Sequence, residues 1–145
     1  MKFKTTQLSI FNSQNFINEI VSWAFDEDGT YVPFKHKIGM YFAVLHYFAE
    51  DVDFDNLGVE ELYDLIYTDD NADEIERFVY GNPQTRDLVS VARDTINARF
   101  DIDKRKTDIY KAINKLVEYL DKNPEIFLSA TAPQVVTSNG EKEET

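Results

Sequence analysis

Residues 51–62, DVDFDNLGVEEL, are the stretch of this sequence whose residue types come nearest to a metal site. An EF-hand calcium loop needs oxygen ligands at positions 1, 3 and 5, a glycine at position 6 and a bidentate Glu at position 12. Aspartates fill the first three positions, but position 6 is Asn56 and position 12 is Leu62. The sequence therefore favours a solvated acidic turn, in which Asp55 or Asn56 caps the following helix, and no metal site is expected.

The two histidines are the next candidates for chemistry. His46 and Glu50 are spaced four residues apart on a predicted helix, so they could share a metal ion or a proton. A zinc site needs at least one more ligand, and the chain has no cysteine to supply it. We expect His46 to be structural or at the surface, and His36, between two lysines, to face solvent.

Catalytic motifs are absent from the sequence. It contains no G-x-S-x-G, P-loop or G-x-G-x-x-G pattern that would place a nucleophile or hold a phosphate. The lack of cysteine also excludes a disulfide framework and a thiolate nucleophile. We therefore expect a protein that is not an enzyme and that carries no cofactor.

The charge is unevenly distributed along the 145 residues, whose net charge is −12. The stretch from Glu50 to Glu76 contains 12 acidic residues and no Lys or Arg, whereas the balance after Gly81 is nearly even. Like-charge repulsion disfavours direct binding to nucleic acid or to an anionic membrane, and favours proteins with basic surfaces. No signal peptide or membrane-spanning run is visible, so the expected location is the cytoplasm, or a virion if the chain is phage-encoded.

Hydrophobic periodicity predicts a central core helix over residues 34–49. Ile38, Phe42, Leu45 and Phe48 form one apolar stripe on it. Gly39 in the same segment is small, and Ala43 likewise, so another helix could approach closely here.

The remaining pattern predicts five further helices. They cover residues 14–25 with Ser13 as the cap, 59–67, 72–80, 83–100 after an Asn82 cap, and 104–122. The last has Ile109, Ile113, Leu116 and Leu120 in alternating four–three steps, a narrow seam through which the chain could form a homo-oligomer.

These elements predict an all-α fold, a compact bundle of five or six helices around the 34–49 helix. We assign residues 1–12 to an N-terminal arm or short strand, 13–128 to a helical domain and 129–145 to a flexible polar tail. No second domain is expected.

Two functions fit this sequence. The first is a non-catalytic interaction or assembly protein, such as a small phage-type structural or adaptor component. The second is an acidic inhibitor that imitates a nucleic-acid backbone and blocks a DNA- or RNA-binding protein. The expected contact surface consists of Phe54, Glu60, Glu61, Tyr63, Asp69 and Asp70. Exposure of Phe54 and Tyr67 would favour the first function, and their burial would favour the second.

Overall fold

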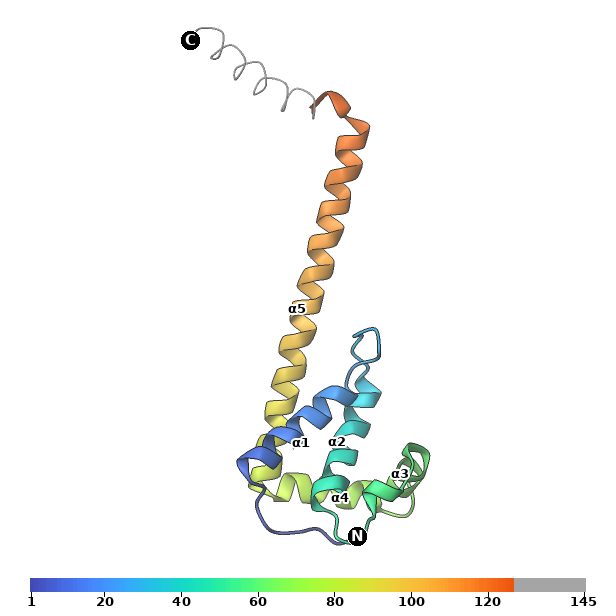
Figure 1. Ribbon diagram of the computed structural model, residues 1–145, viewed down its shortest axis with the longest axis vertical. Coiled ribbons are helices and arrows are strands. Elements are labelled where there is room, and N and C mark those ends of the chain that lie inside the picture. The colour runs from blue at the N-terminus through green and yellow to red at the C-terminus, as the bar shows by residue number, and fades with distance from the viewer. Residues whose placement is uncertain (127–145) are drawn as a thin grey trace. The chain divides into compact units, whose positions relative to one another are not determined.

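The computed structural model describes residues 1–126 and is all-α, as predicted (Figure 1). The elements are α1 (Ile10–Trp23), α2 (Pro33–Phe48), the 3₁₀ turn η1 (Phe54–Asn56), α3 (Val59–Ile66), α4 (Asn71–Gly81) and α5 (Pro83–Lys122). Two isolated bridges are the only β-type pairings in this part of the chain. No helix among residues 1–126 is long and apolar enough to cross a bilayer. The tail predicted for residues 129–145 lies outside the described residues.

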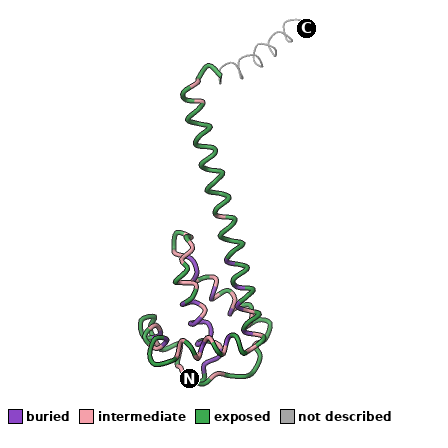
Figure 2. Tube along the Cα trace, turned by 180° about the vertical axis from the view of Figure 1, so that it is seen from behind, coloured by how far each residue is buried: buried purple, intermediate pink, exposed green. Residues whose placement is uncertain are grey.

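The chain divides into two units, Met1–Phe100 and a second that begins at Asp101. This division falls inside the region 13–128, which is predicted as one helical domain. The first unit contains α1 to α4 and the beginning of α5, and it holds the buried core shown in Figure 2. Every described residue from 104 to 119 is exposed.

Helix α2 is the centre of the first unit, which confirms the predicted core helix. Its residues from Tyr41 to Leu45 are buried without interruption, together with Ile38 and Phe48. A helix that is apolar around most of its circumference has to be surrounded by other elements. Residues of α1, α3, α4 and α5 supply that cover, in the same hydrophobic cluster.

Gly39 explains how closely α1 and α2 pack. A Cβ placed on Gly39 would lie 2.4 Å from the Cβ of Trp23 on α1, and 3.4 Å from the carbonyl oxygen of Ile20. The absence of a side chain at this position therefore allows the two helices to approach. This contact confirms the close approach predicted from the small residues of the core helix.

The N-terminal arm packs against its own chain. The Lys4 N–H donates to the Phe48 carbonyl oxygen at 2.7 Å, and the Glu50 N–H donates to the Lys2 carbonyl oxygen at 2.9 Å. The ring of Phe3 stacks on that of Phe78 in α4, with centroids 4.5 Å apart. The arm thus extends the core beyond the end of α2, as an extended segment with a single bridge.

The largest differences from the predicted helix boundaries lie at the start of α1 and in α5. Helix α1 begins at Ile10 rather than residue 14, because Ser9 is the cap and its Oγ accepts from the Asn12 N–H at 3.2 Å. The two helices predicted over 83–100 and 104–122 are one continuous helix, α5. Residues 100–104 contain neither Gly nor Pro, so nothing in the local sequence ends the helix there.

The start of α5 follows the prediction. Asn82 is the cap, and its Oδ1 accepts from the Thr85 N–H at 3.0 Å, while Pro83 is the first helical residue. Proline suits this place because the first backbone N–H groups of a helix lack intrahelical partners.

Candidate interaction surfaces

The predicted acidic surface lies on η1, on α3 and on the turn between α3 and α4. Glu60, Glu61, Asp69 and Asp70 are exposed, whereas Phe54 and Tyr63 are half-buried. Tyr67 is 48% exposed and lies against Tyr63, with ring centroids 4.9 Å apart. The two aromatic residues chosen to separate the functions therefore behave differently. The ring of Tyr63 also lies against that of Phe34, which is 57% exposed, with centroids 6.2 Å apart. This region therefore combines exposed carboxylates with exposed aromatic rings.

Phe54 is held by the core rather than presented to solvent. Its ring stacks on that of His46, with centroids 4.5 Å apart and an interplanar angle of 7°. It also meets the ring of Phe42 edge-on, with centroids 6.4 Å apart. His46 Nδ1 in turn lies 2.8 Å from Glu19 Oε2 on α1, and its Nε2 lies 3.9 Å from Asp55 Oδ1. A groove of about 420 Å³ passes these residues.

The turn before α3 is capped differently from the prediction. Gly58 is the cap residue, and its N–H donates to Glu61 Oε2 at 2.8 Å, whereas Asn56 donates through Nδ2 to Asp53 at 2.7 Å. Asp55 and Asn56 therefore do not cap this helix. Glu61 has a structural task, because it satisfies one backbone donor and lies at the positive end of the helix.

The aspartates that resemble a calcium loop have partners of their own. Both side-chain oxygens of Asp51 accept from the Lys2 N–H, at 3.1 and 3.2 Å, and Asp53 accepts from Asn56. No group of three or more His, Cys, Asp or Glu side chains within residues 1–126 is placed to hold a metal ion.

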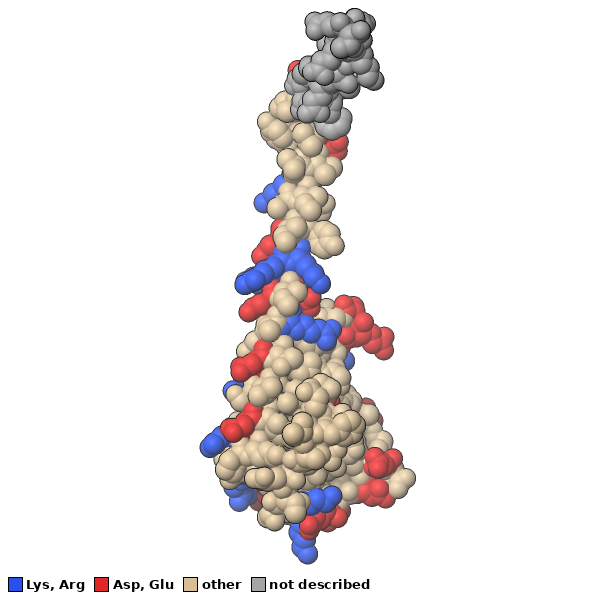
Figure 3. Space-filling view, turned by 60° about the vertical axis from the view of Figure 1, so that its left-hand side comes forward, with Lys and Arg blue, Asp and Glu red and all other residues tan. Residues whose placement is uncertain are grey.

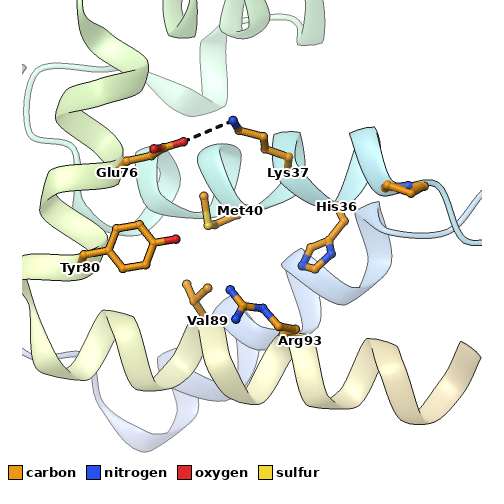
Figure 4. A pocket seen from close by; sticks show the side chains of 8 residues that line it. His36, Lys37, Met40, Glu76, Tyr80, Val89 and Arg93 are labelled. Atoms are coloured by element: carbon orange, nitrogen blue, oxygen red, sulfur yellow. Dashed lines mark ion pairs between the residues drawn. The ribbon is translucent and has the colours of Figure 1, made fainter.

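A small cleft of about 250 Å³ lies between α2, α4 and α5 within the first unit (Figure 4). Its lining consists of Pro33, His36, Lys37, Met40, Glu76, Tyr80, Val89 and Arg93. Lys37 Nζ lies 3.3 Å from Glu76 Oε1, whereas Arg93 has no ion pair in the described part of the chain. The Arg93 guanidinium is therefore a positive charge without a carboxylate partner, in a cleft that is also lined by Met40 and Val89. The space is smaller than a typical small-molecule site and suits a single carboxylate-sized group.

Several groups in or beside this cleft have shifted pKa values. Burial and the hydrogen bond to Glu76 raise the pKa of Tyr41 to about 12. That same hydrogen bond, with the nearby Lys37, lowers the pKa of Glu76. Burial and the Arg93 charge lower the pKa of His36, whose Nδ1 is 3.1 Å from the Tyr31 hydroxyl. His36 is half-buried, so its predicted solvent-facing position is wrong.

The second unit carries an apolar stripe on α5. We define the α5 stripe as Ile102, Ile109, Ile113, Leu116 and Leu120. Ile109 and Leu116 are each 58% exposed, and Ile113 is 49% exposed. Tyr110 and Val117 are exposed beside them and widen the apolar surface. The four–three spacing of the last four members is that of a helix packing along a partner helix.

Charge changes sign along the same part of α5. Residues 104–115 contain five basic residues and one acidic residue, whereas residues 116–126 contain three acidic residues and one basic residue. On the face seen in Figure 3, a cluster of Lys and Arg on this helix is followed by a mostly uncharged surface. The helix therefore combines an apolar stripe with a charge gradient along its axis.

A second exposed apolar feature, which was not predicted, lies at the start of α1. Ile10 is 92% exposed and Phe11 73% exposed, the highest values among the large apolar residues of the described chain. The signal was available, because residues 5–18 contain no charged side chain in a chain that is 29% charged. An uncharged surface with two exposed apolar side chains is suited to contact with another protein.

Comparison of the chain with protein-family models, with curated proteins and with solved structures gave no match. The functional proposal therefore depends on the surfaces described above.

Proposed function

We propose that this chain is a non-catalytic assembly protein that binds another protein through the α5 stripe. The observation that carries the proposal is the exposure of Ile109, Ile113 and Leu116 at coiled-coil spacing. An isolated helix is marginally stable in water, and helices in proteins are stabilised mainly by packing of their apolar face. A helix that continues through residues 101–122 with this face uncovered is suited to receive a partner.

The exposed pair Ile10 and Phe11 supports the same function from the first unit. It provides a second contact of different chemistry, aromatic and aliphatic within an uncharged surface. A small adaptor needs at least two contact surfaces to join other components. The uncompensated Arg93 offers a smaller site for a carboxylate on one of these components.

Paired substitutions on one helix test this function. The full-length tagged chain is used to recover partners from the native host, in parallel with Ile113→Glu and Asn114→Glu. Both variants add the same charge at neighbouring positions, but only residue 113 belongs to the α5 stripe. We expect Ile113→Glu to lose the partner by at least about tenfold, because it desolvates a charge in an apolar contact, and Asn114→Glu to keep it. Equal recovery by all three chains would show that the stripe is not the contact.

A second candidate is the acidic inhibitor, and the exposed carboxylates of α3 and α4 favour it. Glu60, Asp64, Asp69, Asp70 and Asp73 are exposed and have no ion pair within residues 1–126. Such a surface attracts a basic protein and competes with nucleic acid for it. If this is the function, the partner recovered above is displaced by duplex DNA, and Asp69→Asn with Asp70→Asn weakens its binding while Ile113→Glu does not.

A further inference from the structure

We propose that the partner of the α5 stripe is a second copy of this chain, bound with the two helices antiparallel. The inference rests on the proposed function and specifies its partner. Two copies of the α5 stripe can pack against each other, because isoleucine and leucine side chains at four–three spacing can interdigitate with an identical set. A contact of this kind is closed by a twofold axis, so it produces a defined dimer rather than a fibre.

The charge gradient selects the direction of the second helix. In a parallel pair, the basic segment 104–115 of one copy lies beside the same segment of the other, and Lys106 lies opposite Lys106 within the seam. Like charges at such close positions are destabilising. In an antiparallel pair, the basic segment lies beside residues 116–126 of the other copy, where acidic residues predominate.

The seam also selects one register. If the twofold axis passes between Asn114 and Lys115, Ile113 faces Leu116 of the second copy and Ile109 faces Leu120. In the same register Lys106, the one charged residue within the seam, faces Asn123 and lies near Glu125 of the second copy. Ile109, Ile113, Leu116 and Leu120 then each meet an apolar residue, and Lys106 meets a polar one. If the second helix were instead shifted by seven residues so that Lys106 faced Leu116, the Lys106 ammonium group would be desolvated.

The absence of cysteine from the chain makes this geometry directly testable. Ile109→Cys and Leu120→Cys are made separately in the full-length protein and are oxidised alone and as an equal mixture. In the proposed register residues 109 and 120 of the two copies lie at the same level, whereas two copies of residue 109 are offset by 11 positions, which is about 16 Å along the helix. A disulfide requires Cα atoms within about 7 Å, so we expect a mixed disulfide and no homodisulfide.

A matched pair on the outer face gives the control for random collision. Lys111→Cys and Glu118→Cys satisfy the same register but lie on the side of α5 away from the stripe, so their mixture should remain reduced. Homodisulfides from Ile109→Cys or Leu120→Cys alone would overturn the antiparallel arrangement and would identify a parallel pair. A mixed disulfide from the outer pair, at the same rate as the inner pair, would overturn the register.

Sedimentation of the cysteine-free chain separates this inference from the proposed function. We expect a concentration-dependent dimer, shifted to monomer by Ile113→Glu and retained by Asn114→Glu. A monomer at all concentrations would overturn the second copy as the partner, whereas the proposed function would then depend on recovery of a different protein that is lost with Ile113→Glu. Binding of the monomer to anionic lipid vesicles through the stripe, with no dimer, would also overturn the inference.

Discussion

The two units of this chain contain the same kind of apolar helical pattern but differ in what covers it. In Met1–Phe100, residues such as Phe16, Phe42 and Ile75 are fully buried by other elements of the unit. In the described part of the second unit, Ile109 and Leu116 are more than half exposed. Periodicity therefore predicts a helix and its apolar face, whereas the surface that covers this face depends on contacts distant in sequence.

Removal of a core side chain should have the largest effect, and it tests whether the first unit is stabilised by its own core. Phe48 is fully buried, and the centroid of its ring lies 5.8 Å from that of Phe16 and 5.1 Å from that of Phe78. We expect Phe48→Ala to lower the free energy of unfolding by about 3–5 kcal/mol, through lost burial and a residual cavity. Urea unfolding followed by the fluorescence of Trp23, the single tryptophan of the chain, reports on this unit.

The control for Phe48→Ala is Ile113→Ala in the second unit. Because Ile113 is exposed, we expect this change to alter the Trp23-monitored free energy by less than about 0.5 kcal/mol. Equal losses from the two substitutions would contradict the division of the chain into a self-stabilised unit and a helix with an uncovered face.

The contact between α1 and α2 provides the second test of the first unit. An alanine at Gly39 would bring its Cβ to 2.4 Å from the Trp23 Cβ, a distance that forces the two helices apart. We expect Gly39→Ala to lower the free energy of unfolding by about 1–3 kcal/mol, despite the better helix propensity of alanine. At Gly81, by contrast, an added Cβ meets no atom within 4 Å, so Gly81→Ala should be neutral or stabilising. Stabilisation by both substitutions would show that the helices do not meet at Gly39.

Tyr41 should link the stability of the first unit to alkaline pH. Its pKa is raised to about 12 in the folded chain, from about 10 in an unfolded chain, so the folded state holds the proton more tightly. The stabilisation is therefore complete below pH 10 and is lost as the pH rises towards 12. Tyr41→Phe should remove this pH-dependent part and, by breaking the hydrogen bond to Glu76, lower stability at neutral pH by about 1.5 kcal/mol.

The measurement is the difference in free energy of unfolding between the wild type and Tyr41→Phe, taken at intervals from neutral pH to pH 11. Other tyrosines and lysines also titrate in this range, and the difference isolates residue 41. Tyr110→Phe in the second unit is the control, because Tyr110 is 68% exposed and its loss should not change stability. A constant difference between wild type and Tyr41→Phe at all pH values would contradict the raised pKa.

Much of the fold could be predicted from local sequence signals. The all-α class, the central helix, the Asn82–Pro83 start of α5 and the close approach at Gly39 all follow from patterns within a few residues of each position. The errors have equally specific causes. The break predicted near residue 100 is wrong, because no Gly or Pro interrupts α5 after Pro83 and the backbone continues as one helix.

The candidate sites were harder to predict because they depend on contacts between distant segments. His46 pairs with Glu19, which is 27 residues away, and no local spacing indicates this contact. Phe54 was expected among exposed acidic residues, but the His46 ring covers it. The α5 stripe is the exception, since its spacing was visible in the sequence, although its exposure was not. Local spacing therefore predicted the composition of a surface better than its burial.

The smallest expected change in the free energy of unfolding comes from substitutions at two threonines of α5, one in each unit. Thr85 is fully buried, and its hydroxyl finds no hydrogen-bond partner among the described residues, whereas the Thr107 hydroxyl donates to the Asp103 carbonyl oxygen at 3.0 Å. A buried hydroxyl without a partner is destabilising, so Thr85→Val, which keeps the shape and removes the polar group, should stabilise the first unit by about 1 kcal/mol. Thr107→Val should leave the Trp23-monitored transition unchanged, because the residue is exposed and lies in the second unit.

Thr85→Ser completes the test: it keeps the hydroxyl and removes a buried methyl group, which should lower the free energy of unfolding by about 1 kcal/mol. If Thr85→Val destabilised the chain instead, the hydroxyl would have a partner such as a buried water, and the core of the first unit would contain a polar contact at Thr85.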